Sequence, residues 1–207
     1  MERDATARRG DDLRDPAAHL PRTDDEDVLE AHDAQANFRA MPTVRRATAA
    51  DADAIGRIQV ESWRAAYAGL LPEETIAAFD VAARQQLWRD GLERPPRPGS
   101  ATFVAAVGDE TVGFATVGTS QSEDATGELY AIYVRPSSWG HGAGRALIER
   151  SEESLRDSGF AQALLWVLDG NERAERFYRA AGWERDGEKE DVFQGATVTE
   201  LRYRKQL

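Results

Sequence analysis

Residues 129–147 read Leu-Tyr-Ala-Ile-Tyr-Val-Arg-Pro-Ser-Ser-Trp-Gly-His-Gly-Ala-Gly-Arg-Ala-Leu, and this stretch decides the fold. It begins with a strand, Leu129–Val134, that is apolar on both faces, which predicts a central place in a sheet. A glycine-rich loop at 139–144 follows and leads into a helix that we expect to end near Asp157. Such glycines let an anion approach backbone N–H groups at the positive end of a helix dipole. The stretch therefore predicts a phosphate-binding turn.

Other phosphate-binding motifs do not fit this loop. A P-loop requires a Gly-Lys pair, and the sequence contains none. A dinucleotide-binding fingerprint requires Gly-x-Gly-x-x-Gly, but after Gly140 and Gly142 the third position is Arg145. A strand-to-helix turn with a purely structural role remains open on these residues alone.

The flanking sequence alternates strand and helix patterns and so predicts an α/β domain. The spacing of Thr48 and Asp51 is that of a capping box before a helix. The proline-rich segment 93–99 predicts a loop, because proline removes backbone donors. The expected strands are 43–47, 102–107, 111–118, 163–168, 183–193 and 198–204; the expected helices are 49–67, 73–79, one from 81 through 88, and 172–181.

Composition and charge narrow the class of protein. The 207 residues carry 37 acidic and 26 basic side chains, and this net charge of −11 disfavours nucleic acid or an anionic membrane as a partner. The absence of cysteine excludes disulfides, a thiolate nucleophile and a thiolate metal site, and three histidines without ligand spacing predict no metal. Without a signal-like or membrane-spanning apolar stretch, we expect a cytoplasmic protein.

The first 40 residues differ in character from the rest. They hold 11 acidic and six basic side chains and few apolar ones, which predicts a disordered or loosely docked extension at 1–40. One folded domain is expected at 41–207.

The sequence resembles the GCN5-related N-acetyltransferases (GNAT family). The resemblance rests on the stretch quoted above, on a block from Asn171 through Phe177 and Tyr178 to Gly182-Trp183, and on residues 60–72, which resemble the opening helix of a bacterial subgroup without an assigned substrate. Trp139 departs from the acyl-CoA signature, which usually begins with Gln or Arg.

The resemblance implies the architecture and the reaction. We expect an α/β fold with a mixed, mostly antiparallel sheet of six or seven strands, helices on both faces, and a splay between the strands at 129–134 and 163–168. The implied activity is direct transfer of acetyl from acetyl-CoA to a primary amine of a small molecule or peptide, in a ternary complex and without a metal. An exposed edge strand near the C-terminus would allow a homodimer.

Acetyl transfer needs a base for the ammonium proton, a donor to the oxyanion and an acid for the departing thiolate. The resemblance makes Glu128 the expected base, with a solvated strand-end glutamate as the alternative. It implies a backbone N–H near Ile132 for the oxyanion. It also makes Tyr178 the expected acid, with a buried aromatic stripe of Phe177 and Tyr178 as the alternative.

Further residues are assigned to binding by the same resemblance. Asn171 would bind the pantetheine arm, cap its helix, or do both. Trp63, Arg64 and Tyr67 would line the acceptor pocket, or else be core aromatics and a solvated arginine. The expected acyl-CoA-binding residues are Ile132, Tyr133, Val134, Trp139, Gly140, His141, Gly142, Ala143, Gly144, Arg145, Asn171 and Ala174.

Two other functions stay open. A catalytically weak acyl-CoA-binding sensor or interaction module would keep the same fold, and Trp139 in the signature favours it. An acyltransferase that uses a longer acyl donor is the other. The sequence does not identify the acceptor, although the negative charge would favour a cationic amine by electrostatic steering.

Overall fold

A computed structural model describes residues 41–193 and 196–207 of the chain, so the predicted extension at 1–40 lies outside the described residues. Within these ranges the elements follow the predicted order with boundaries shifted by a few residues. They are β1 (Thr43–Arg46), α1 (Ala52–Tyr67), α2 (Glu73–Ala77), α3 (Val81–Glu93), β2 (Ala101–Val107), β3 (Glu110–Thr119), β4 (Gly127–Val134), α4 (Ala143–Asp157), β5 (Gln162–Leu168), α5 (Glu172–Ala180), β6 (Glu184–Phe193) and β7 (Ala196–Gln206).

One seven-stranded sheet runs in the order β1-β2-β3-β4-β5-β7-β6. All neighbouring strands are antiparallel except β4 and β5, which are parallel. The mixed, mostly antiparallel sheet is therefore confirmed. The strand β6 forms the outer edge near the C-terminus, and the homodimer expected through this edge stays a prediction.

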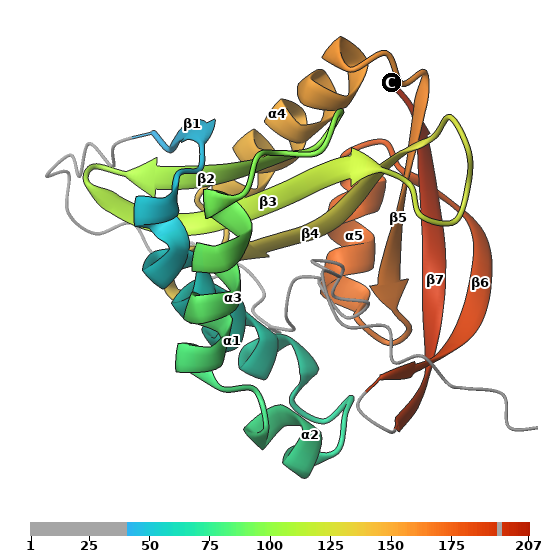
Figure 1. Cartoon of the computed structure of the whole chain (residues 1–207). Coiled ribbons are helices and arrows are strands. Elements are labelled where there is room, and N and C mark those ends of the chain that lie inside the picture. The colour runs from blue at the N-terminus through green and yellow to red at the C-terminus, as the bar shows by residue number, and fades with distance from the viewer. Residues whose placement is uncertain (1–40, 194–195) are drawn as a thin grey trace, which may run out of the picture.

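The two central strands separate soon after they begin. β4 pairs with β5 only at Gly127 with Ala163 and at Glu128 with Leu164, and beyond these pairs the strands diverge (Figure 1). From there β5 is paired along its length with β7 instead. The predicted splay is thus present, with its vertex at Glu128.

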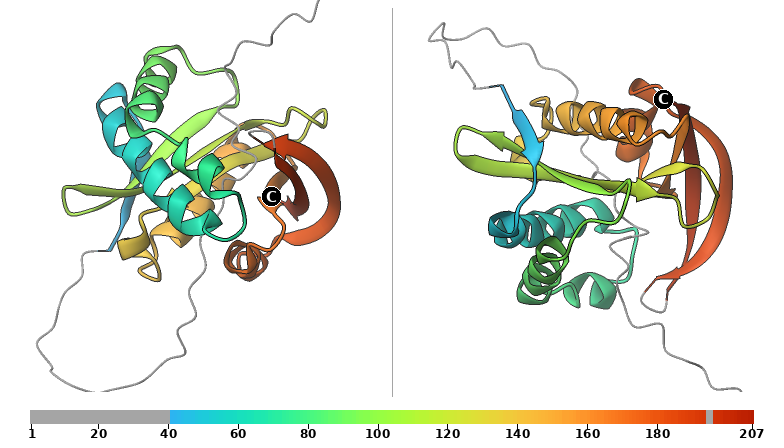
Figure 2. Two further views of the ribbon diagram at one scale, coloured as in Figure 1. Left: turned by 90° about the horizontal axis from the view of Figure 1, so that it is seen from below. Right: turned by 45° about the horizontal axis from the view of Figure 1, so that its top comes forward.

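Helices cover both faces of the sheet, as expected (Figure 2). On one face α4 and α5 bury a core that includes Leu147, Tyr178 and Trp183. On the other face α1 and α3 bury a second core around Trp63 and Trp88. Because β4 alternates between these cores, its backbone is fixed from both sides.

Local capping explains where the helices begin. The predicted box before α1 is formed: the Thr48 N–H donates to the Asp51 carboxylate at 2.8 Å, and Arg45 binds both oxygens of that carboxylate at 2.7 and 2.8 Å. The carboxylate of Asp80 accepts from the Ala83 N–H at 2.8 Å and caps α3. None of the helices in the described ranges has the length and apolar character needed to span a membrane.

Candidate functional site

The open edge of β4 presents backbone groups to the splay. The Arg135 N–H donates to the Val112 carbonyl of β3 at 2.8 Å. Because successive N–H groups along a strand point to opposite sides, those of Val134 and Ile132 point away from β3, toward the gap beside β5. Ile132 is fully buried, so its N–H lies in a place from which water is largely excluded.

The carbonyl at the end of β4 anchors the following loop. Val134 accepts hydrogen bonds from the Ser62 hydroxyl of α1 at 2.9 Å and from the Trp139 indole N–H at 2.6 Å. Trp139 thus folds back onto the strand that precedes it. The contact of Ser62 was not predicted, because a small polar residue on a buried helix face gives no signal of a partner 72 residues away.

The glycine-rich loop has the backbone conformation of an anion-binding turn. Gly140 and Gly142 have φ values of 73° and 85°, which residues with a Cβ rarely adopt. Helix α4 begins at Ala143 with no side-chain cap, so its first N–H groups have no partner within the helix. The His141 side chain is exposed, while a Cβ on Gly144 would lie 3.4 Å from the Phe177 ring of α5.

Helix α5 brings a basic side chain to this turn. The Arg173 guanidinium lies 4.2 Å from the centre of the Trp139 ring. Burial, together with the nearby charge of Arg176, lowers the pKa of Arg173, which nonetheless remains a cation at neutral pH. Sequence reasoning did not select Arg173, because nothing in the linear pattern places it beside a loop more than 30 residues earlier.

Tyr178 and Asn171 sit on the same helix in different surroundings. Tyr178 is fully buried among Phe177, Trp183 and Tyr203, with ring centres 5.2 to 6.3 Å away, and burial raises its pKa well above the usual 10. The Asn171 side chain accepts from the Ala174 N–H at 3.2 Å, which is the capping role expected from the sequence.

Glu128 occupies the vertex of the splay. The residue is 1% exposed, and its carboxylate accepts hydrogen bonds from the Ser120 hydroxyl at 2.9 Å and the Gln121 N–H at 3.3 Å. Its neighbour Gly127 packs against Leu155 of α4, so alternation along the strand directs Glu128 to the opposite face. The alternative of a solvated strand-end glutamate is therefore wrong.

The expected acceptor-binding residues of α1 are tightly packed. Trp63 and Tyr67 are fully buried; Trp63 stacks on Phe79 with ring centres 4.2 Å apart and meets Tyr67 edge-on at 5.1 Å. The exposed Arg64 donates to the Phe79 carbonyl at 3.0 Å. These contacts make Trp63 and Tyr67 core aromatics, and acceptor binding by any of the three stays a prediction.

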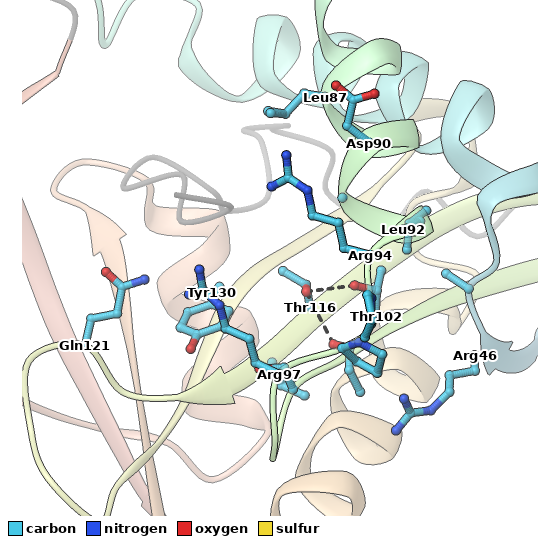
Figure 3. Close-up of a pocket in the computed structure, with 17 residues that line it drawn as sticks. Arg46, Leu87, Asp90, Leu92, Arg94, Arg97, Thr102, Thr116, Gln121 and Tyr130 are labelled. Carbon is cyan, nitrogen blue, oxygen red and sulfur yellow. Dashed lines mark hydrogen bonds between the residues drawn. The ribbon is translucent and has the colours of Figure 1, made fainter. Parts of the chain in front are cut away.

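A cavity of about 410 Å³ lies on the Glu128 face of the sheet, between the segment 93–99 and strands β2 to β4 (Figure 3). Its wall includes Arg94, Arg97, Thr116, Gln121 and Tyr130. We call this space the loop cavity. The sequence predicted only a loop at 93–99, because prolines indicate a break in regular structure but not what lies beneath it.

Comparisons with known proteins agree with this geometry. The acetyltransferase (GNAT) family model matches residues 57–183. The chain is 32% identical to the uncharacterized N-acetyltransferase YuaI of Bacillus subtilis, over 78% of this chain and 91% of that protein.

Solved structures show the same fold. A ribosomal-protein-alanine N-acetyltransferase from Brucella melitensis aligns with a TM-score of 0.63 and 26% identity, over 80% of this chain and 99% of that one. The protein yncA from Salmonella typhimurium, solved with its cofactor acetyl-CoA, aligns with a TM-score of 0.60 and 22% identity, over 80% of this chain and 93% of that one. The splayed sheet, the glycine-rich turn and these likenesses together establish that the chain belongs to the GNAT family of acetyltransferases.

Proposed function

We propose that this protein transfers the acetyl group of acetyl-CoA directly to a primary amine within a ternary complex. As a member of its family it is an acyl-CoA-dependent N-acetyltransferase. The observation that carries the proposal is the splay: β4 and β5 pair at two positions only, so backbone groups of β4 face a gap that begins at Glu128.

The turn at 139–145 fits the diphosphate of coenzyme A. Its uncapped N–H groups and the positive φ values of Gly140 and Gly142 suit an anion held by the main chain, which needs no side chain from Trp139. The guanidinium of Arg173 adds a positive charge beside Trp139, where the family signature usually has Gln or Arg. Asn171 and Ala174 would contact the pantetheine arm.

The same gap suits the thioester. The N–H of Ile132 would donate to the carbonyl oxygen as it gains negative charge, with Tyr133 and Val134 as its neighbours along the strand. A main-chain donor that is already fixed by two cores requires little reorganisation. The bound acetyl-CoA supplies the activated acetyl group.

Two side chains would move the protons. An amine with a pKa near 10 is about one part in a thousand unprotonated at pH 7, so Glu128 takes its proton directly or through water. The amine nitrogen then bonds to the carbonyl carbon, the carbon–sulfur bond breaks, and the Tyr178 phenol gives its proton to the thiolate. The second proton of the nitrogen, which is lost as the acetamide forms, would return to the Tyr178 oxygen. The products are an acetamide and free coenzyme A.

The alternative is a module that binds acyl-CoA without efficient transfer. The hydrogen bond from Trp139 to the Val134 carbonyl favours it, because that indole stands where a polar phosphate ligand is usual in the family. Calorimetric titration with acetyl-CoA, followed by free-thiol release with a panel of primary amines, separates the two. Binding with thiol release supports the enzyme, binding without release from any amine supports the module, and absence of binding contradicts both.

A further inference from the structure

The loop cavity has a rigid basic rim. Arg94 and Arg97 come from the segment Glu93-Arg-Pro-Pro-Arg-Pro-Gly99, in which prolines restrict the backbone. Arg94 has φ −75° and ψ 147°, the extended conformation required before proline. Figure 3 shows the Arg94 and Arg97 side chains extending from this loop on the side of Tyr130, with Arg46 on the opposite side of the cavity.

The charge of the cavity wall is opposite to that of the whole chain. Three arginines (46, 94 and 97) and one acidic residue, Asp90, line it, in a protein whose net charge is −11. The Asp90 carboxylate accepts a hydrogen bond from Gln86 of its own helix at 2.6 Å. A local positive rim in an acidic protein favours an anionic ligand group at short range, where guanidinium forks pair with carboxylate or phosphate.

One part of the cavity wall adjoins Glu128. Gln121 lines the cavity, and its backbone N–H donates to the Glu128 carboxylate at 3.3 Å. Tyr130 lines the cavity two residues beyond Glu128 on β4. The cavity wall is also polar at Thr102 and Thr116, whose hydroxyls lie 3.0 Å apart. A ligand in the cavity can therefore contact both the arginines and the part of the wall that adjoins the vertex of the splay.

We propose that the loop cavity is the acceptor subsite and that it selects primary amines carrying an anionic group. The inference rests on the proposed function, which places Glu128 beside the reacting nitrogen. In this arrangement Arg94 and Arg97 bind the carboxylate or phosphate of the acceptor, and the amine of the acceptor lies at the vertex of the splay beside Glu128. The volume of about 410 Å³ suits a small molecule rather than a folded partner.

The test compares acceptors that differ only in the anionic group. Amino acids with a terminal amine, from 3-aminopropanoate to 6-aminohexanoate, are each paired with the alkylamine that lacks the carboxylate. Comparing 2-aminoethyl phosphate with ethylamine tests whether a phosphate serves as the anionic group. Free-thiol release with saturating acetyl-CoA gives kcat/KM for each. We expect the anionic member of at least one pair to be preferred about tenfold, the effect of one good charge-assisted contact.

In the variant Arg94→Gln/Arg97→Gln, the ratio of kcat/KM between the anionic acceptor and its alkylamine should fall close to one, mainly because KM for the anionic acceptor rises. The kcat/KM for the alkylamines should stay unchanged. Arg89→Gln is the matched control, because Arg89 lies on α3 but pairs with Asp53 at 2.6 Å and is not part of the cavity wall. Equal kcat/KM within every pair, or a preference that survives the double substitution, overturns the inference.

Failure of the proposed function would give a different result. If no amine releases thiol, transfer is contradicted and the cavity is tested by calorimetry with glutarate. Glutarate binding that is lost in Arg94→Gln/Arg97→Gln but kept in Arg89→Gln then supports an anion-binding cavity. Absence of glutarate binding to the unaltered protein overturns it.

Discussion

Tyr178 is the residue on which the proposed proton transfer depends most directly. Replacing it with Phe should lower kcat by about 10- to 10⁴-fold while leaving acetyl-CoA affinity nearly unchanged, because only the departing thiolate uses the proton. Thiol release and calorimetry measure the two effects. Tyr203→Phe is the control: this buried phenol donates to Glu175 at 2.8 Å, and its loss should affect stability but not kcat.

The raised pKa of Tyr178 adds a pH criterion. Because burial raises the pKa of Tyr178 well above 10, the phenol keeps its proton throughout the neutral and mildly alkaline range. The general acid should therefore cause no loss of kcat below about pH 10. An alkaline loss with an apparent pKa of about 8 to 9 that disappears in Tyr178→Phe would contradict this environment for the phenol.

At the scale of elements, glycines at the two ends of α4 allow an effect on acetyl-CoA binding to be distinguished from an effect on stability. Gly142 and Gly159 lie at opposite ends of the helix with φ of 85° and 88°, and neither has a neighbour close enough to exclude a methyl group. Alanine at either should cost about 1 to 2 kcal/mol of unfolding free energy through backbone strain. Only Gly142→Ala should also weaken acetyl-CoA binding, measured by calorimetry; equal affinities in the two variants would exclude the turn as the diphosphate site.

The entry to α1 gives a pH-dependent prediction. The pKa of Asp51 is lowered, and the largest cause is the hydrogen bonding from the Arg45 guanidinium. Because the pKa of Asp51 is lower in the folded than in the unfolded chain, its ionised carboxylate stabilises the folded protein above the unfolded pKa of about 4. This stabilisation is lost as the pH falls through the folded pKa. Asp51→Asn should therefore lower the unfolding free energy by about 1 kcal/mol at pH 7 and by less near pH 2. Urea denaturation at both pH values checks this, and an equal difference at both would contradict it.

At the scale of the whole molecule, sequence patterns predicted the elements and the fold but only part of the site. The glycine turn, the apolar strand and the cap at Asn171 are local features, which short stretches of sequence encode directly. The burial of Glu128 depends on the loop at 120–121, and the loop cavity depends on a proline segment folding over β2 and β3. Such contacts join distant segments, so residue type and spacing do not reveal them.

The order of strands makes β7 essential to the whole molecule. Beyond Gly127 and Glu128, β5 has no pairing with β4, so removing residues 194–207 leaves most of β5 without a neighbour. We expect such a chain to lose its near-UV circular dichroism and become sensitive to proteolysis. A chain lacking only Leu207, which keeps the full β7, is the control. A folded, protease-resistant truncation would contradict the dependence of β5 on β7.

The position of β7 also bears on how the protein is made. During translation β1 to β3 can assemble with α1 and α3 while the nascent chain is still growing, because all their partners in the sheet precede β5. Strand β7, which follows both β5 and β6 in the sequence, inserts between them. The half of the sheet that forms the far wall of the gap is therefore completed only once β7 has been synthesised, so β5 and β6 wait for a strand that follows both of them in the sequence.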